Sequence, residues 1–319
     1  MSKSIKKLLE NRLFIQVLPI IFLVVMSIFF AVTTQGRFIQ TNSLKIILEQ
    51  SLIVGTVSTG ATFIFATGNV NLAMGATTVL TATLAGMVFN RTESVPIMIL
   101  AAIALGVILM TISVLLSTIF HVRVMFVTIV MMTLLTALQQ TILGGSTVSV
   151  AYAVTNGLRN AGFMYISFGI FFVICIVLFH MTAIGRSLRM LGTNEVCATQ
   201  TGLEKPRLLT TAFIIAGVGC GIGSILAIVR AGSIGQNTLT SLNMDCMLAL
   251  VLGGMSIFGG SKSFVYSGIV GAITVCALNQ GMTMLNIDTN IVQGVRGILF
   301  LILVCMGQQR PKGLPAPEG

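Results

Sequence analysis

The stretch MTAIGRSLRMLGTNEVCATQTGLEKPR, residues 181–207, separates two apolar segments that are each long enough to span a membrane. It carries charged side chains in a chain of which only 8% of residues are charged: Arg186, Arg189, Glu195, Glu204, Lys205 and Arg207. A polar stretch between two spans must lie in water, and its basic excess predicts the cytoplasmic side. The rest of the chain is therefore interpreted as membrane-spanning segments on either side of this loop.

The centre of the loop predicts a short helix, at about 192–203, that lies along the membrane surface. Gly202 is then the C-cap, because glycine adopts the left-handed conformation that ends many helices, and Pro206 stops any continuation.

Composition predicts that the chain is an integral membrane protein. The 319 residues are 55% hydrophobic, and the mean hydropathy is +1.01. A soluble domain has about 45–50% apolar and about 25% charged residues. The net charge of +10 is explained by basic residues in cytoplasmic loops. No basic patch is interleaved with aromatic residues, so we expect the lipid bilayer and no nucleic acid as a partner.

Hydropathy predicts an all-α, polytopic integral membrane protein of about ten transmembrane helices, some of them short or broken. The apolar segments run at 13–34, 46–66, 71–89, 95–118, 124–143, 163–180, 208–230, 244–258, 264–284 and 291–307. The second and third are separated only by TGNV at 67–70, so they are two spans or one re-entrant element. We expect one transmembrane domain over residues 1–319, with a flexible tail at 308–319.

The distribution of basic residues predicts the orientation. With both termini in the cytoplasm, twelve of the 18 basic residues lie inside: Lys3, Lys6, Lys7, Arg12, Arg123, Arg186, Arg189, Lys205, Arg207, Lys262, Arg310 and Lys312. The inverted orientation reverses this bias, against the positive-inside rule. The longest outer loop is then Gly144 to Gly162. It covers an entrance, contacts an external partner or merely connects two spans.

The sequence favours a function without bond chemistry. No pair of carboxylates and no histidine cluster lies within the apolar segments, so no catalytic or metal site is expected. The six cysteines show no CxxC spacing, and most lie in apolar segments, where cysteine behaves as a small hydrophobic residue. The middle of each predicted span is almost uncharged, which disfavours a proton relay.

ATGNVNLAMGA, residues 66–76, is the best candidate for a solute pathway. Unpaired backbone groups at membrane depth are tolerated only where they line a cavity, and Gly68 and Asn69 permit a break between two helices. A purely structural break is an equal alternative. The polar residues expected at depth are Thr67, Gly68, Asn69, Asn71, Asn279 and Gln280.

Glycines in the second half of the chain predict close packing of helices. In lipid, small residues let helix backbones approach one another. The glycines assigned to this role are Gly217, Gly221, Gly253, Gly254, Gly259 and Gly260.

Five segments in register, from about Asn42 to Gln309, carry a family resemblance. They are QSLIVGTVSTGATFIFATGNVNLAMGA (50–76), RVMFVTIVMMTLL (123–135), TAIGRSLRMLGTNEVCATQTGL (182–203), VRAGSIGQNTLTSLNMDCMLALVLGGMSIFGG (229–260) and GIVGAITVCALNQGMTML (268–285). The chain resembles the permease subunits of bacterial ABC importers for ribose and related monosaccharides. The family usually has Asp at the position of Asn71 and Ala at the positions of Val196 and Cys197.

The resemblance implies a subunit of the bacterial inner membrane that forms a path for a sugar. It implies three partners: a cytoplasmic ABC ATPase, a second permease chain, identical or not, and an extracytoplasmic sugar-binding protein. ATP and Mg²⁺ would be bound by the ATPase, and no cofactor by this chain. The predicted loop helix would be the coupling helix that docks into the ATPase, through Arg186, Asn194, Glu195, Ala198 and Gly202.

Two alternatives remain open at this point. One is a permease of the same superfamily for another small polar solute, such as a nucleoside or an autoinducer sugar. The other is a stand-alone secondary transporter.

Overall fold

The structure is a computed structural model that describes residues 12–256, 259–260 and 263–307. Its helices are α2 (Arg12–Thr33), α3 (Thr41–Ala66), α4 (Met74–Thr92), α5 (Val95–Ile119), α6 (Val124–Leu143), α7 (Tyr152–Asn160), α8 (Phe163–Ile176), α9 (Ala183–Thr193), α10 (Glu195–Gln200), α11 (Lys205–Ala231), α12 (Leu242–Leu252), α13 (Tyr266–Met284) and α14 (Thr289–Gly307). A 3₁₀ turn, η1 (Arg37–Ile39), precedes α3, and a π-helical turn, η2 (Val177–Met181), ends α8.

The all-α class is confirmed, because the described residues are helical apart from turns and one pair of two-residue strands. The strands β1 (Val148–Ser149) and β2 (Ser233–Ile234) pair antiparallel, with Val148 opposite Ile234. The predicted tail at 308–319 lies outside the described residues.

Each of the ten predicted apolar segments contains a helix, but the predicted number of spans is not confirmed. Only five described helices are long and apolar enough to cross a membrane: α3, α5, α6, α8 with η2, and α11. Three more are apolar but shorter, at Pro19–Thr33, Leu242–Leu252 and Asn290–Leu303. The helix predicted at 244–258 ends at Leu252, because Gly253 and Gly254 follow in a turn.

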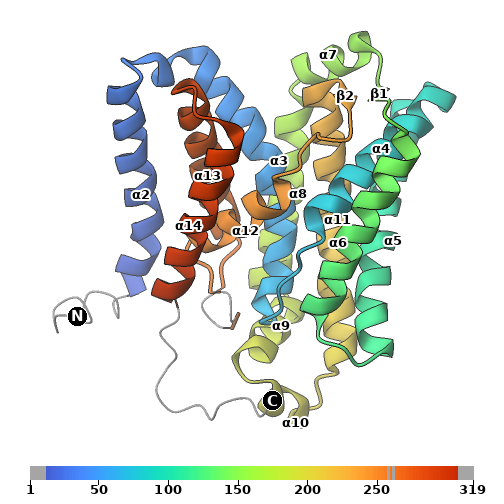
Figure 1. Cartoon of the computed structure of the whole chain (residues 1–319). Helices are drawn as coiled ribbons and strands as arrows, with labels where there is room; N and C mark the ends of the chain where they lie inside the picture. Colours follow the sequence, from blue (N-terminus) through green and yellow to red (C-terminus); the bar gives the residue numbers. More distant parts are fainter. Residues whose placement is uncertain (1–11, 257–258, 261–262, 308–319) are drawn as a thin grey trace.

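The elements define two ends of the bundle (Figure 1). The α7 end holds α7, the two strands and the start of α3. The α10 end holds α9, α10, the end of α3, the start of α2 and the end of α14. The first and last described helices therefore open and close the chain at the same end as the polar loop, as the predicted topology requires.

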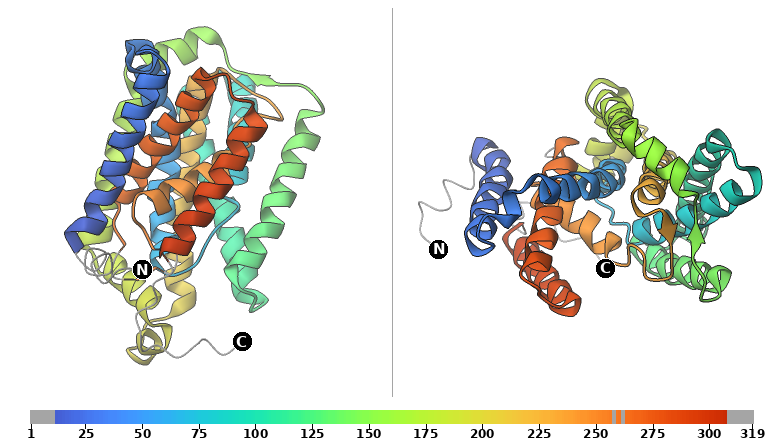
Figure 2. Two further views of the ribbon diagram at one scale, coloured as in Figure 1. Left: turned by 60° about the vertical axis from the view of Figure 1, so that its left-hand side comes forward. Right: turned by 90° about the horizontal axis from the view of Figure 1, so that it is seen from above.

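Helices α3 and α11 form the centre of the bundle. In their most apolar stretches 83% and 78% of residues are buried within the protein, against 28%, 28% and 22% in α5, α6 and α8. Seen from above, α2, α5, α6 and α8 lie at the periphery (Figure 2). Their outward faces carry large apolar side chains such as Leu100, Val130 and Ile170, which suits contact with lipid.

Alternate glycines of α11 pack this centre on two sides. A Cβ at Gly217 would lie 2.7 Å from Val107 Cα, and one at Gly221 would lie 2.7 Å from Ala102 O, both in α5. Gly219 and Gly223 face α3 instead. Any larger residue would push the helix backbones apart, so these glycines set the spacing of the central helices.

Three of the other glycines assigned to helix packing need correction. Gly254, Gly259 and Gly260 lie in the segment between α12 and α13, with φ of +86°, +70° and +92°. They are turn residues, because only glycine adopts this backbone conformation without strain. Gly253, the C-cap of α12, does approach the backbone of α13 closely, at Ser267.

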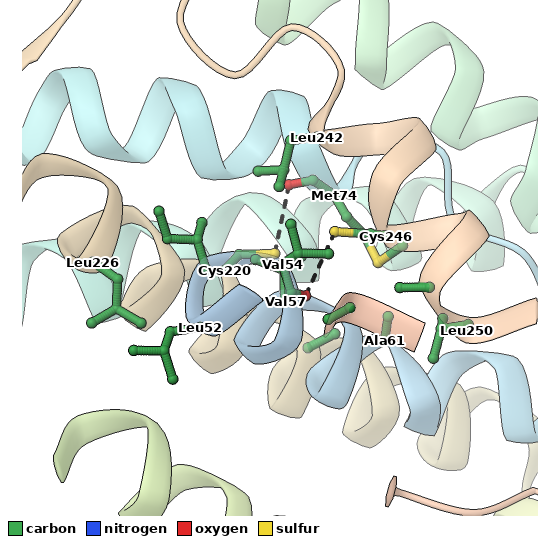
Figure 3. Close-up of a cluster of buried hydrophobic side chains, with 14 of the residues drawn as sticks. Leu52, Val54, Val57, Ala61, Met74, Cys220, Leu226, Leu242, Cys246 and Leu250 are labelled. Atoms are coloured by element: carbon green, nitrogen blue, oxygen red, sulfur yellow. Dashed lines mark hydrogen bonds between the residues drawn. The ribbon is translucent and has the colours of Figure 1, made fainter. Parts of the chain in front are cut away.

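Two buried thiols lie next to backbone carbonyl groups in the core. Cys220 Sγ lies 3.7 Å from Met74 O, and Cys246 Sγ lies 3.9 Å from Val54 O (Figure 3). The five cysteines whose side chains the structure describes are all free, and of these only Cys197 is exposed.

Candidate translocation and coupling sites

The predicted break between α3 and α4 is present. The chain is not helical over 67–73, and Gly68 turns it with a φ of +77°. This segment runs from the α10 end back into the bundle before α4 begins (Figure 1). The segments predicted at 46–66 and 71–89 thus form one full helix, α3, and a second helix, α4, that starts inside the protein after an extended stretch.

Side chains satisfy the backbone of the extended stretch. Asn71 is fully buried, and its Oδ1 accepts a hydrogen bond from Ala73 N–H at 2.8 Å. Its Nδ2 donates to Met110 Sδ at 3.2 Å, and Thr128 Oγ1 accepts from Leu72 N–H at 3.3 Å. Asn71 therefore forms an Asx-type turn with Ala73, the residue that precedes α4, and contacts α5.

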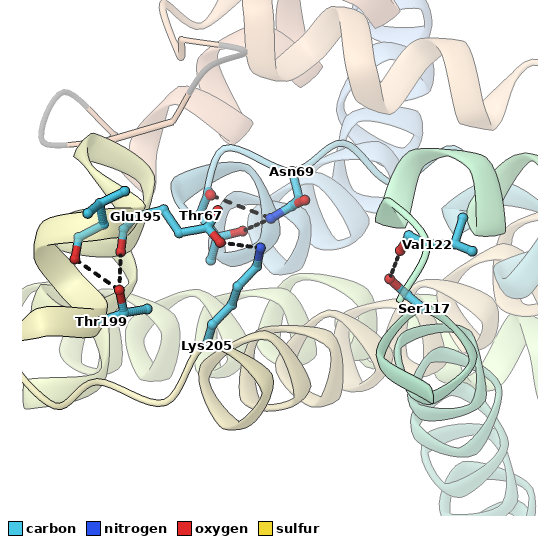
Figure 4. Close-up of polar contacts among 8 residues, drawn as sticks. Thr67, Asn69, Ser117, Val122, Glu195, Thr199 and Lys205 are labelled. Atoms are coloured by element: carbon cyan, nitrogen blue, oxygen red, sulfur yellow. Dashed lines mark hydrogen bonds and ion pairs between the residues drawn. The ribbon is translucent and has the colours of Figure 1, made fainter. Parts of the chain in front are cut away.

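Asn69 lies differently. It is half-buried, and its Nδ2 donates to Thr67 Oγ1 at 3.0 Å (Figure 4). Gly68 beside it is exposed. Of the four candidate residues in this segment, Gly68 and Asn69 are the most accessible.

The start of α12 lies against the start of α4. Asn243 Oδ1 accepts a hydrogen bond from Gly75 N–H at 2.5 Å, which satisfies one of the unpaired donors in the first turn of α4. A Cβ at Gly75 would lie 2.6 Å from Asn243 N, so only glycine permits this approach. Two helices thus begin next to each other inside the protein, each with the positive end of its dipole there.

A buried ion pair ties together the last three helices. Arg296 Nη1 in α14 lies 3.2 Å from Asp245 Oδ1 in α12, and Arg296 Nε donates to Asn279 Oδ1 in α13 at 2.7 Å. Ser241 Oγ donates to the other Asp245 oxygen at 3.0 Å. All three of Asp245, Asn279 and Arg296 are less than one-tenth exposed.

The pairing of Asp245 with Arg296 was missed by the sequence reasoning. The available signal was that opposite charges stand in the eighth and the tenth of the predicted apolar segments, where an unpaired charge is costly. Asn279, expected in the solute pathway, belongs to this network, whereas its neighbour Gln280 is half-buried.

A second ion pair holds the α7 end. Arg159 donates from Nε and Nη2 to the two carboxylate oxygens of Glu49, at 2.8 and 2.7 Å. The Glu49 side chain is 4% exposed and that of Arg159 is 38% exposed. This fork joins α7 to α3. The loop predicted at Gly144–Gly162 is therefore folded, into β1 and α7, across this end of the bundle.

The predicted coupling helix is α10, which spans Glu195–Gln200 within the expected 192–203. Asn194 is its N-cap, since Oδ1 accepts from Cys197 N–H at 3.2 Å. Gly202, at a φ of +83°, ends it, and Leu203 N–H donates to Ala198 O at 3.2 Å, as in a Schellman motif. The glycine rule therefore located the C-terminal end of this helix, whereas its start, expected at about 192, lies at Glu195.

The outer face of α10 is open and carries both polar and apolar side chains. Ala198 is buried against the protein, whereas Glu195, Val196 and Thr199 are exposed. Glu195 forms an ion pair with Lys205 at the start of α11, and both side chains remain accessible (Figure 4). Arg186, on α9, is exposed as well. Such a surface suits contact with another protein.

Comparison with known proteins identifies the family. A model of the family described as branched-chain amino acid transport system / permease component matches residues 43–304. The chain belongs to this permease family. The permease is 24% identical over 289 residues to the ribose import permease protein RbsC of Escherichia coli K12, which covers 87% of this chain and 89% of that protein.

Two further relatives of the permease have different cargo in their names. The fructose import permease protein FrcC of Rhizobium meliloti is 25% identical over 304 residues, or 91% of this chain and 84% of that protein. The autoinducer 2 import system permease protein LsrD of Salmonella typhimurium is 27% identical over 280 residues, 84% of each. No solved structure matches the permease significantly.

Proposed function

We propose that this permease is the transmembrane subunit of an ATP-driven importer and that its cargo is a monosaccharide. The observation that carries the proposal is the family match over residues 43–304, together with relatives named for the import of ribose and fructose. The subunit catalyses no bond chemistry. ATP and Mg²⁺ are bound by a separate ATPase, and this chain binds no cofactor.

The α10 helix is the proposed docking element for the ATPase. Its capped ends hold it in one orientation, and Glu195, Val196 and Thr199 face outward. Glu195 already has a partner in Lys205, so docking would either bury this pair or replace Lys205 by a group of the ATPase. Asn194, Ala198 and Gly202 then shape the helix, and exposed Arg186 extends the surface.

The proposed sugar path follows the interior starts of α4 and α12. The accessible Gly68 and Asn69, with Thr67 beside them, are the proposed contacts at the α10 end, and Gln280 is a further candidate. Asn71 and Asn279 are satisfied by protein groups, so we assign them to the walls of the path. Transport would be driven by an ATPase that binds the inward-open and the outward-open conformation of the permease with different affinities.

The assembly would contain two permease chains, identical or not, two ATPases and an extracytoplasmic binding protein. In this proposal α10 and both termini face the bacterial cytoplasm. Cysteine placed at Gln200, in a chain whose exposed Cys197 is replaced, should react with an impermeant thiol reagent only in inside-out vesicles. Labelling in intact cells would contradict the orientation.

The proposal is tested by transport in proteoliposomes that contain the permease, its co-expressed ATPase and the binding protein. Uptake of radiolabelled ribose or fructose should require ATP on the α10 side and the binding protein on the other. Uptake that follows an ion gradient without ATP would overturn it in favour of a secondary transporter. That alternative is not favoured, because the buried carboxylates Glu49 and Asp245 are both paired with arginines.

A further inference from the structure

Three segments that are far apart in sequence meet through their backbones at the α10 end. They are the last turn of α9, at Gly192 and Thr193, the end of α3, at Ala66 and Thr67, and the turn at 259–260. Gly260 N–H donates a hydrogen bond to Ala66 O at 3.1 Å. A Cβ at Gly192 would lie 2.8 Å from Gly260 N and 3.0 Å from Thr67 C, and closer still to Ala66 O. We call this contact the glycine junction.

The turn at 259–260 requires glycine for two independent reasons. Both residues have positive φ, of +70° and +92°. A Cβ at Gly259 would also lie 2.6 Å from Phe65 O, and one at Gly260 would lie 3.0 Å from Thr193 Oγ1. At these glycines no side chain lies between the three backbones. A movement of one backbone is therefore not absorbed by a side chain that changes its conformation.

Each segment of the junction leads to a different part of the proposed machine. From α9 the chain passes directly into α10, the proposed docking helix. From Ala66 it enters the extended stretch 67–73 and then α4. The turn at 259–260 connects α12, whose Asn243 caps α4, with α13. The junction is thus the place where the end of α9, which leads into the docking helix, contacts the segment that precedes α4 and the segment that follows α12.

A second contact holds α9 to the same part of α3. Arg189 lies over the Phe179 ring, with Cζ 5.2 Å from the centroid, and its Nε donates to Gly185 O at 3.1 Å. The Phe179 ring in turn packs edge-on to Phe63 of α3, with centroids 5.3 Å apart. Leu188 of α9 is fully buried. Because packed interiors compress little, α9 cannot shift without moving the end of α3.

We infer that the glycine junction transmits the displacement of α10 to the break at 67–73, with Gly192 as the residue that sets the contact. This inference rests on the proposed function. The coupling is mechanical: α9 bears directly on the backbone of Ala66 and Thr67. A side chain at Gly192 separates α9 from α3, so α10 then moves without moving the break.

The variant that tests the inference is Gly192→Ala, with Gly169→Ala as its matched control. Gly169 is a glycine of α8 at which a Cβ would meet nothing within 4 Å. Gly192→Ala should keep the ATPase bound and hydrolysing ATP, while sugar uptake falls about tenfold or more, as expected when a coupling free energy is lost. Gly169→Ala should leave both activities unchanged. Coupled uptake at the control level in Gly192→Ala would overturn the inference.

A second measurement needs no substitution in the junction. It tests the inference even if Gly192→Ala does not accumulate in the membrane. Amide hydrogen exchange is compared in the assembled wild-type importer with and without vanadate-trapped nucleotide. The peptide that contains 67–73 should change its protection together with that containing 192–193, and no change at 67–73 would overturn the inference. Wild-type uptake that does not depend on ATP would instead refute the proposed function.

Discussion

The α7 end and the α10 end of the bundle are held together in different ways. At the α7 end, the fork between Arg159 and Glu49 joins α7 to α3, and one short strand pair joins β1 to β2. At the α10 end, the glycine junction places three backbones in direct contact. An ion pair and a strand pair of two residues can be exchanged for water, whereas interlocked backbones must move together. We therefore expect the α7 end to open and close, and the α10 end to shift as one body.

The largest expected effect concerns the buried pair Asp245–Arg296, on which the position of α12 depends. Arg296→Met leaves Asp245 as an uncompensated buried charge, which costs about 3–5 kcal/mol of stability. Thermal unfolding of the purified permease would measure it. The double variant Asp245→Leu with Arg296→Met removes both charges and should recover most of the loss. An equal loss in both would mean that packing, and not charge, is responsible.

The second effect concerns docking at the α10 end. Glu195→Ala should weaken association with the ATPase by about 2–5 kcal/mol if the carboxylate is desolvated at that interface. It should hardly change the stability of the permease, since an exposed ion pair contributes about 0–1 kcal/mol. Co-purification of the ATPase measures the first quantity.

Lys205→Ala is the control for this prediction, because it breaks the same intrachain pair from the other side. If both variants weaken docking equally, the pair with Lys205 is what the ATPase requires. Wild-type association and coupled uptake in both would make this loop a connector only.

A smaller effect is expected at the α7 end. Arg159→Ala removes two charge-assisted hydrogen bonds from the buried Glu49, and should lower stability by about 1–3 kcal/mol. Arg159→Lys keeps the charge but not the two parallel bonds, so it should fall between. Denaturation midpoints would compare them with Arg37→Ala, an exposed arginine at the same end. If Arg37→Ala costs as much, the fork has no special role.

The smallest effect is expected at the turn before α4. Asn71→Ala leaves Ala73 N–H without its acceptor, and a neutral hydrogen bond of this kind contributes about 0.5–1.5 kcal/mol. Asn71→Asp keeps the acceptor oxygen and should be milder, although it cannot donate to Met110. Stability and uptake should be measured on the same preparations. A loss of uptake with unchanged stability would assign Asn71 to the path and not to its wall.

Local signals in the sequence predicted the boundaries of single elements well. Gly202 marked the end of α10 because capping depends on a few neighbouring residues, and Gly68 and Asn69 marked the break for the same reason. The N-cap Asn194 carries an equally local signal, but the start of the helix was expected at about 192. Long-range contacts were not predictable in this way. The pairing of Arg296 with Asp245, and the meeting of Gly192 with Ala66 and Gly260, depend on how helices pack in three dimensions.

The length of the spans was also beyond local reasoning. Hydropathy counts apolar residues, and it assigned 244–258 to one helix although Gly253 and Gly254 end α12 in a turn. Other helices surround α12 and the extended stretch before α4. Their apolar residues therefore pack in the protein core, and these segments do not cross the membrane on their own.

The most direct test of the difference between the two ends is a pair of distances in the assembled importer. Spin labels at Thr199 in α10 and Asn69 report on the α10 end, and labels at Tyr152 in α7 and Leu44 in α3 report on the α7 end. Addition of nucleotide should leave the Thr199–Asn69 distance unchanged and alter the Tyr152–Leu44 distance. A change confined to Thr199–Asn69, with the α7 end fixed, would contradict the account.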